Sequence, residues 1–161
     1  MSETVLDKSL LFFFRVTIGW TFLYAGAHQL LDPAWSAAGF LSHTKTFHDV
    51  FAVFSAPALL PYTNFLVQWG HLLIGLSLIS GLLVRVSGVF GILLMATYYF
   101  AHMDFPYIEN KLNLFVDYHL IYAGVLVYLI ARHAGRVWGL DGLLSNMGFV
   151  ERHPRAAVLV S

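Results

Sequence analysis

The chain has 161 residues, of which 58% are hydrophobic and only 11% are charged. A typical soluble domain carries about 25% charged residues, so this composition argues against a soluble globular domain. Nine basic and nine acidic residues give zero net charge, which leaves no electrostatic footprint for binding nucleic acid. The absence of cysteine excludes disulfides, thiolate chemistry and cysteine-held iron–sulfur clusters.

Four apolar stretches approach the length of a membrane span, which is about 20 residues of helix. They are predicted at about residues 8–31, 62–84, 86–102 and 113–134. Because a spanning segment must satisfy its own backbone hydrogen bonds, we expect each stretch to be a helix. The sequence therefore predicts an all-α integral membrane protein, a four-helix bundle that forms one domain over residues 1–147. Residues 148–161 are expected to form a cytoplasmic tail.

The connections between these helices are unequal. A tight turn around residues 85–88 is expected between the second and third helices, and a polar loop over residues 103–112 between the third and fourth. In the long first connection, the spacing of one helix face is shown by Phe47, Val50, Phe51 and Phe54. We expect an amphipathic helix there on the outer membrane surface, either as an anchor or as a lid over a site in the bundle.

Basic residues lie unevenly about the predicted spans. With four spans, both termini and the turn between the second and third helices share one side of the membrane. That side contains Lys8, Arg85, Arg132, Arg136, Arg152 and Arg155, whereas the other side contains only Lys45 and Lys111. The positive-inside rule therefore places both termini in the cytoplasm.

Ionisable residues inside the apolar stretches need a reason, because each costs a few kcal/mol at membrane depth. Arg15 lies about two turns into the first helix, where it can snorkel to the inner interface, pair with a carboxylate such as Asp141 or hold an anionic group. Four histidines fall on four different predicted helices, all in the outer half: His28, His71, His102 and His119. His71 and His119 are expected to lie deeper than the other two.

Carboxylate and aromatic side chains accompany these histidines: Asp117 near His119, Trp69 near His71, and Tyr98 and Tyr99 about one turn before His102. Histidine and aspartate can exchange protons near neutral pH, and aromatic side chains can wall a flat apolar ligand. Together they suit the head group of a membrane quinone, whose reduction needs protons as well as electrons. The alternative is that these residues only form the polar and aromatic belt expected near helix ends.

Clustered histidines can also bind metal. Two of them with a carboxylate could hold iron, copper or zinc, and the similar predicted depths of His71 and His119 leave a bis-histidine haem open. No pair has a helix-borne metal spacing such as His-x-x-x-His, so no metal site is predicted. No nucleotide or flavin motif is visible either. Electrons would then come from a small substrate, a partner subunit or a cofactor without a sequence motif.

Short motifs along the chain carry a resemblance to a known family. The first helix has Arg15, Gly19 and Gly26 before Leu-Asp-Pro at 31–33, the second contains GHLLIG at 70–75, and GRVWGLD stands at 135–141. Over about residues 8–145 the chain resembles the DoxX family and is similar to the related DoxD subunit of thiosulfate:quinone oxidoreductase. The resemblance implies a four-helix bundle in a prokaryotic plasma membrane. For the DoxD branch it also implies thiosulfate oxidation to tetrathionate, with quinone as the electron acceptor.

The leading hypothesis is a quinone-linked membrane redox protein with thiosulfate as the expected donor class. The expected catalytic residues, which would exchange protons with the quinone, are His71, His119 and Asp117. The expected ligand-binding residues are Arg15, His28, Trp69, Tyr98, Tyr99, His102 and Phe115. An anionic donor would approach from outside past His28, His102 and the loop that carries His43, Lys45 and His48.

A second hypothesis is a non-enzymatic membrane anchor or an accessory subunit of a separate redox complex. A third is a small transporter, although no inverted repeat supports one. The expected partners are membrane lipid, a membrane quinone, a redox partner subunit and a second copy of the chain, and no nucleic acid.

Overall fold

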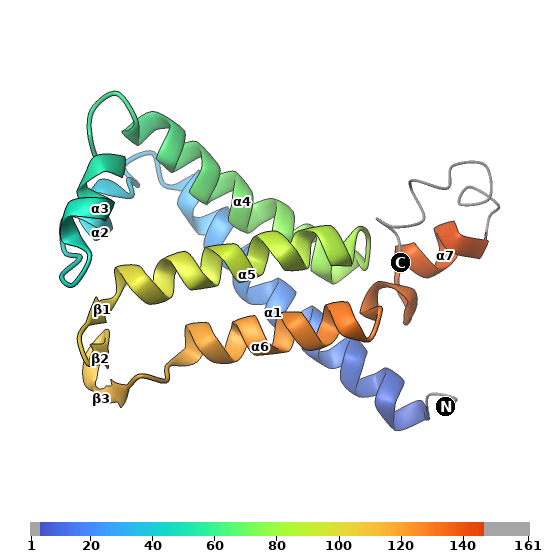
Figure 1. Ribbon diagram of the computed structural model, residues 1–161. Helices are drawn as coiled ribbons and strands as arrows, with labels where there is room; N and C mark the ends of the chain where they lie inside the picture. Colours follow the sequence, from blue (N-terminus) through green and yellow to red (C-terminus); the bar gives the residue numbers. More distant parts are fainter. Residues whose placement is uncertain (1–3, 147–161) are drawn as a thin grey trace.

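Four long helices make up most of the computed structural model, which describes residues 4–146. They are α1 (Val5–Leu31), α4 (Leu60–Ser80), α5 (Val84–Ala101) and α6 (Tyr118–Ala131). Helix α1 packs along α4 and α5 packs along α6, and the two pairs meet mainly between α4 and α5 (Figure 1). The expected tail at 148–161, with Arg152 and Arg155, lies outside the described residues.

These helices lie close to the predicted apolar stretches, with two shifts in their boundaries. The turn between α4 and α5 is formed by residues 81–83 rather than 85–88, because Gly81 takes a left-handed conformation (φ 70°) that ends α4. Helix α6 begins at Tyr118 rather than near residue 113, because Asp117 caps its N-terminus by accepting a hydrogen bond from Leu120 N. His119 therefore lies in the first turn of α6, not deep inside a longer helix as predicted.

Two of the long helices, α1 and α5, are long and apolar enough to cross a membrane, and α6 is a shorter apolar helix. Large apolar side chains remain exposed on α1 and α5, including Phe13, Trp20, Phe90 and Leu93. Exposed apolar surface of this extent is typical of a surface that contacts lipid.

Small elements cover one end of the long helices. Helices α2 (Ala38–Leu41) and α3 (His48–Phe54) follow α1, and α3 confirms the helix predicted in the first connection. A three-stranded antiparallel sheet joins α5 to α6, with strands β1 (Met103–Asp104), β2 (Tyr107–Ile108) and β3 (Asn110–Leu114). This sheet replaces the predicted polar loop. The N-terminus, the α4–α5 turn and the segment after α6 lie at the opposite end (Figure 1).

Close packing holds α1 against α4. A Cβ atom at Gly26 would lie 2.4 Å from Leu72 N, and one at Gly75 would lie 2.3 Å from Leu23 N. Only glycine fits at such distances, so these two residues let the helix backbones touch. The main core next to this contact is built by all four long helices, with Phe22, Leu78, Met95 and Leu126 buried in it.

A buried arginine joins α1 to the segment that follows α6. Arg15 is completely buried, and its guanidinium donates hydrogen bonds to Ala134 O (2.6 Å), Val137 O (2.9 Å) and Trp138 O (3.0 Å). The acceptors lie in and after the short helix η1 (Ala134–Arg136). Arg15 thus neither snorkels to an interface nor forms the direct ion pair with Asp141 that the sequence left open.

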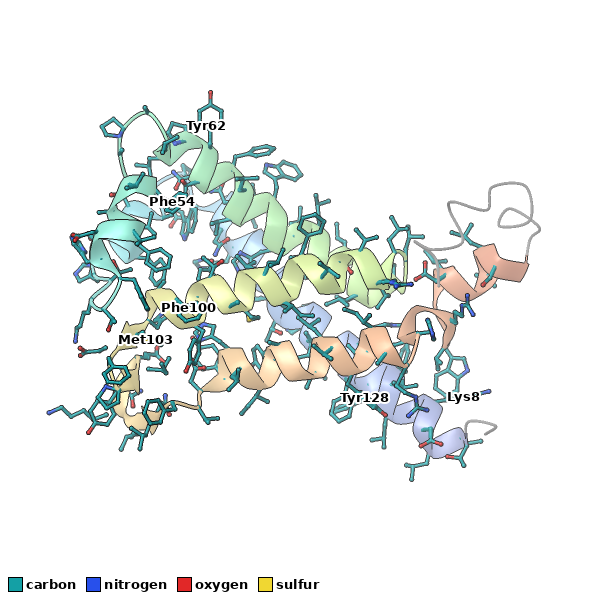
Figure 2. All side chains as sticks on the ribbon, viewed as in Figure 1. Lys8, Phe54, Tyr62, Phe100, Met103 and Tyr128 are labelled. Carbon is teal, nitrogen blue, oxygen red and sulfur yellow. The ribbon has the colours of Figure 1, made fainter. Side chains whose placement is uncertain are left out.

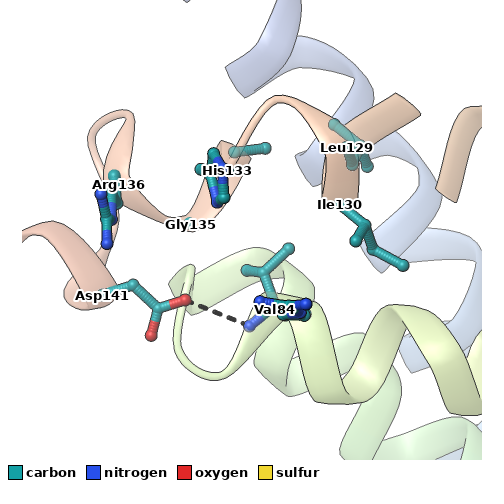
Figure 3. Close-up of a pocket in the computed structure, with 9 residues that line it drawn as sticks. Val84, Leu129, Ile130, His133, Gly135, Arg136 and Asp141 are labelled. Carbon is teal, nitrogen blue, oxygen red and sulfur yellow. Dashed lines mark hydrogen bonds between the residues drawn. The ribbon is translucent and has the colours of Figure 1, made fainter. Parts of the chain in front are cut away.

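Asp141 fastens the same end of the structure. Its carboxylate accepts hydrogen bonds from Leu83 N (2.8 Å) and Val84 N (3.2 Å) at the start of α5, and Figure 3 shows the second of these bonds. Asp141 belongs to α7 (Leu140–Asn146), so the bonds tie that helix to the α4–α5 turn. Burial raises the pKa of the Asp141 carboxyl above its ordinary value, while the two N–H donors and nearby Arg15 oppose the shift. We call Arg15, Asp141 and the backbone groups that they bind the inner clasp.

Replacing Arg15 with methionine should lower the free energy of unfolding by about 3 kcal/mol or more, because the buried carbonyls lose a charged donor. Denaturant titration of the protein in detergent micelles, followed by circular dichroism, measures the change. The control is Lys111→Met, which removes an exposed cation on β3 and should shift the value by less than about 0.5 kcal/mol. Equal stability of the two variants would contradict the importance of the inner clasp.

Candidate functional site

A cavity of about 370 Å³ lies between the four long helices, toward the end covered by α2, α3 and the sheet. Each long helix contributes to its wall. The polar aromatic side chains that line it are His71, His102, His119, Tyr98, Tyr118 and Tyr122. Buried Phe22 and Met95 supply an apolar part of the same wall. We call this space the membrane cavity.

His71 lies in the middle of α4 and is almost completely buried. Its Nδ1–H donates to Val67 O one turn earlier (2.8 Å). A carbonyl oxygen can only accept a hydrogen bond, so Nδ1 carries the proton and the neutral ring keeps its lone pair on Nε2. The ring stacks with that of Tyr98, with centroids 5.6 Å apart and planes 24° apart.

His102 lies at the C-terminal end of α5, and its ring is held by a backbone carbonyl as the ring of His71 is. Its Nδ1–H donates to Tyr98 O (2.9 Å), so Nε2 is again the nitrogen that a ligand can use. The His102 ring lies beside that of His119, with centroids 4.9 Å apart.

The buried pair of Asp117 and His119 supplies the third imidazole. One carboxylate oxygen of Asp117 accepts the Leu120 N–H that begins α6 (3.4 Å), and the other accepts a hydrogen bond from His119 Nδ1. Both side chains are nearly inaccessible to solvent. The carboxylate fixes the orientation of the ring, leaves Nε2 for a ligand and stabilises the imidazolium when Nε2 takes a proton.

Tyrosine rings surround these imidazoles. Tyr98 contacts both His71 and His119, the latter at a centroid distance of 5.9 Å. Tyr118 lies against His119 (4.1 Å) and against Tyr122 (5.7 Å). The result is an aromatic wall that can pack on a flat ring and still offer hydroxyl groups for hydrogen bonding.

A second cavity, of about 240 Å³, adjoins the membrane cavity at His102, which lines both. Besides His102, its polar lining comes from His43, Thr44 and Lys45 in the connection after α2, and from Asp104 and Glu109 in the sheet region. Lys45 forms an ion pair with Asp104. We call this cavity the vestibule.

The structure brings together His71, His102, His119, Asp117 and Tyr98, which are among the residues predicted from the sequence. These residues come from α4, from α5 and from the start of α6. The sequence analysis chose these residues by their side-chain chemistry alone. The fold places four of them around the membrane cavity and joins Asp117 to His119 behind them.

The other predicted residues lie elsewhere. Arg15 is in the inner clasp, and exposed His28 packs beside Tyr24 on the outside of α1. Trp69 lines a separate apolar groove with residues of α4 and α5. The Tyr99 hydroxyl donates a hydrogen bond to Phe115 O (2.7 Å). The Phe115 side chain is exposed, just before α6 begins. Neighbouring residues on a helix point in different directions, so Trp69 and Tyr99 face away from the cavity that His71 and Tyr98 line.

Several lining residues were not among the predicted site residues, including Phe22, Gln29, Met95, Tyr118 and Tyr122. Their spacing carries a signal. Phe22, Ala25 and Gln29 recur at intervals of three and four residues on α1, as do Met95, Tyr98 and His102 on α5. Such intervals define one face of a helix, so extending the helical spacing from each histidine would have found part of this set.

Metal binding finds no further support in the geometry of residues 4–146. Over this range, no group of three or more histidine or acidic side chains is arranged to hold a metal ion. The absence of a bound metal ion stays a prediction, and a bis-histidine haem stays an open alternative.

Replacing Asp117 with asparagine should move a proton on the His119 ring. The asparagine oxygen can keep the bond from Leu120 N, which turns its NH₂ group toward His119 Nδ1, and Nδ1 must then accept. Nitrogen-15 NMR of the histidine rings should show that Nδ1 loses its proton, with the signal assigned through its loss in His119→Gln. Asp104→Asn is the control, and an unchanged Nδ1–H in Asp117→Asn would contradict the role of the carboxylate.

Comparison with protein-family models finds a match to DoxX over residues 10–103. The matched range runs from α1 to β1 and includes His71, Tyr98 and His102, whereas the Asp117–His119 pair lies beyond it. No curated protein and no solved structure matches the chain. Because the match spans more than half of the chain, the protein belongs to the DoxX family of membrane proteins.

Proposed function

We propose that the protein binds a membrane quinone in the membrane cavity and exchanges electrons and protons with it. The observation that carries this proposal is the lining, which combines three imidazoles and three tyrosines with apolar Phe22 and Met95 around about 370 Å³. Sites for small molecules and cofactors typically measure about 300–1,000 Å³ and combine apolar walls with a few polar groups. A quinone head group has a matching form, a flat apolar ring with two polar oxygens.

The histidines divide the proton chemistry unequally. Conversion of a quinone to a quinol takes up two electrons and two protons. Protonated His119 can donate its Nε2 proton to the quinone while its Nδ1–H remains hydrogen-bonded to the Asp117 carboxylate. The charge of that carboxylate favours the imidazolium form. His71 has only the Val67 carbonyl behind its Nδ1–H. We therefore assign His119 as the stronger proton acceptor and His71 as the weaker one.

We further propose that all four long helices span a prokaryotic plasma membrane, with both termini in the cytoplasm. Besides buried Arg15, the cations at the end with the N-terminus and the α4–α5 turn are Lys8, Arg85, Arg132 and Arg136, and the opposite end has Lys45 and Lys111. In Figure 2, Lys8 lies at the first end and Met103 at the other. The positive-inside rule supports this orientation, which puts the membrane cavity in the outer half of the bundle.

Thiosulfate is the donor that the DoxD resemblance favours. Two thiosulfate ions lose two electrons to form tetrathionate, and the quinone takes these electrons together with two protons. The charges of the vestibule do not favour an anionic donor, because Lys45 is paired with Asp104 and the carboxylate of Glu109 lies in the same lining. The donor is therefore a separate question from quinone binding, and the two are measured separately.

Quinone binding is tested with a short-chain quinone and purified protein in nanodiscs, by equilibrium dialysis. The variant is His71→Gln combined with His119→Gln, which removes two imidazole rings from the cavity. We expect its Kd to rise at least about tenfold, which corresponds to about 1.4 kcal/mol. His28→Gln, on the exposed side of α1, should bind as the wild type does. Unchanged affinity in the double variant would contradict the site.

Enzyme activity is tested by adding thiosulfate to the same quinone-loaded samples and following the absorbance of the quinone. Reduction that the double histidine variant loses supports a thiosulfate:quinone oxidoreductase. Quinone binding without reduction would favour the accessory-subunit hypothesis, in which a partner delivers the electrons.

The orientation is tested with single cysteines, since the chain has none of its own. Lys111→Cys on β3 and Leu143→Cys on α7 place exposed thiols at opposite ends of the helices. A membrane-impermeant maleimide should label Lys111→Cys in intact cells and Leu143→Cys only after permeabilisation. Labelling of Leu143→Cys in intact cells would contradict cytoplasmic termini.

A further inference from the structure

The two cavities share one titratable side chain, His102. We propose that His102 and Glu109 form a proton port that joins the membrane cavity to the outer solution through the vestibule. The inference rests on the proposed function, because a bound quinone takes up protons on reduction and a bound quinol releases them on oxidation. The port adds Glu109, which neither the family match nor the sequence motifs single out.

His102 is placed to pass protons on the inner side of the port. Its ring lies beside that of His119, at 4.9 Å between centroids, and Nδ1 is held by Tyr98 O. Nε2 is therefore the atom that takes up and gives up the proton. Phe40 also packs against the His102 ring, at 4.8 Å between centroids.

Glu109 is fixed on the outer side of the port. Its backbone N–H donates to His102 O (2.8 Å), so the connection between β2 and β3 is tied directly to the end of α5. Preceding Ile108 is completely buried and anchors this connection. The Glu109 carboxylate lines the vestibule together with His102.

The backbone conformation of Glu109 is a second, independent observation that favours a functional role for its side chain. Its φ angle is 64°, in the left-handed region where a residue other than glycine costs of order 1 kcal/mol or more. Glycine would remove that cost at this position. A glutamate held there against its backbone preference is consistent with a carboxylate that is needed in the vestibule.

The other charged and titratable groups of the vestibule are already engaged. Asp104 is paired with Lys45, and His43 Nδ1 is held by Gly39 O, which leaves an imidazole but no second free carboxylate among the described residues of the vestibule. Glu109 is thus the vestibule carboxylate whose neighbours leave it open to exchange with water. On quinol oxidation, the two electrons leave to an external acceptor and each O–H bond breaks toward a histidine Nε2. The proton then passes through His102 Nε2 and the Glu109 carboxylate to water.

The test follows proton release from bound quinol. Ferricyanide accepts one electron per ion and no proton, so two ferricyanide ions convert one quinol to quinone and release two protons, which a pH dye reports in weakly buffered solution. Wild-type protein and Glu109→Gln are loaded with the same quinol in nanodiscs. Ferricyanide is raised until the wild-type rate no longer increases. Asp49→Asn, an exposed carboxylate on α3 outside both cavities, is the matched control.

We expect Glu109→Gln to slow proton release about tenfold or more, with the quinol Kd and the final number of protons unchanged. Acetate, a small carrier that can enter the vestibule, should restore the rate in this variant and leave the control unaffected. Release at the wild-type rate, or slow release that acetate does not restore, would overturn the port. Wild-type protein that fails to bind quinol would instead overturn the proposed function.

Discussion

The fold depends on the way in which one buried cation is satisfied. A guanidinium inside an apolar helical protein needs oxygen acceptors, and the two terminal nitrogens of Arg15 donate to three backbone carbonyls after α6, while Nε has no acceptor among the described residues. Helix α1 packs chiefly on α4, and α6 packs on α5. The arginine therefore links the two helix pairs at one end, where Asp141 adds a second link to the start of α5. With this end fixed, the helices can separate toward the other end and leave the membrane cavity between them.

At the membrane cavity, single residues both fix the ends of helices and supply the polar groups of the site. Asp117 begins α6 and also orients the ring of His119. His102 ends α5 while lining two cavities, and its carbonyl receives the N–H of Glu109. At Asp117 and His102, residues that start and end helices therefore also supply polar groups to the cavity, whereas His71 lies in the middle of α4. In a chain with so few charged residues, helix ends offer such groups partners that lie already within hydrogen-bonding distance.

The sequence predicts the helices well because apolar length is a strong signal, and it predicts their ends less well because ends depend on caps. The left-handed conformation of Gly81 and the capping carboxylate of Asp117 moved two boundaries by several residues. The strands before α6 are too short to show alternation, so the sheet had no readable pattern. At the site, residue type identified His71 and His119, but the rotation of each helix decided that Tyr98 faces the cavity and Tyr99 does not. No sequence rule points from Arg15 to backbone carbonyls more than a hundred residues away.

The glycine contact between α1 and α4 has a mechanical consequence. Two helices whose backbones touch at Gly26 and Gly75 have no side-chain layer between them that could be compressed or rearranged. We therefore expect α1 and α4 to move as one unit, so that a change in the volume of the membrane cavity would come from movement of α5 and α6 about the inner clasp.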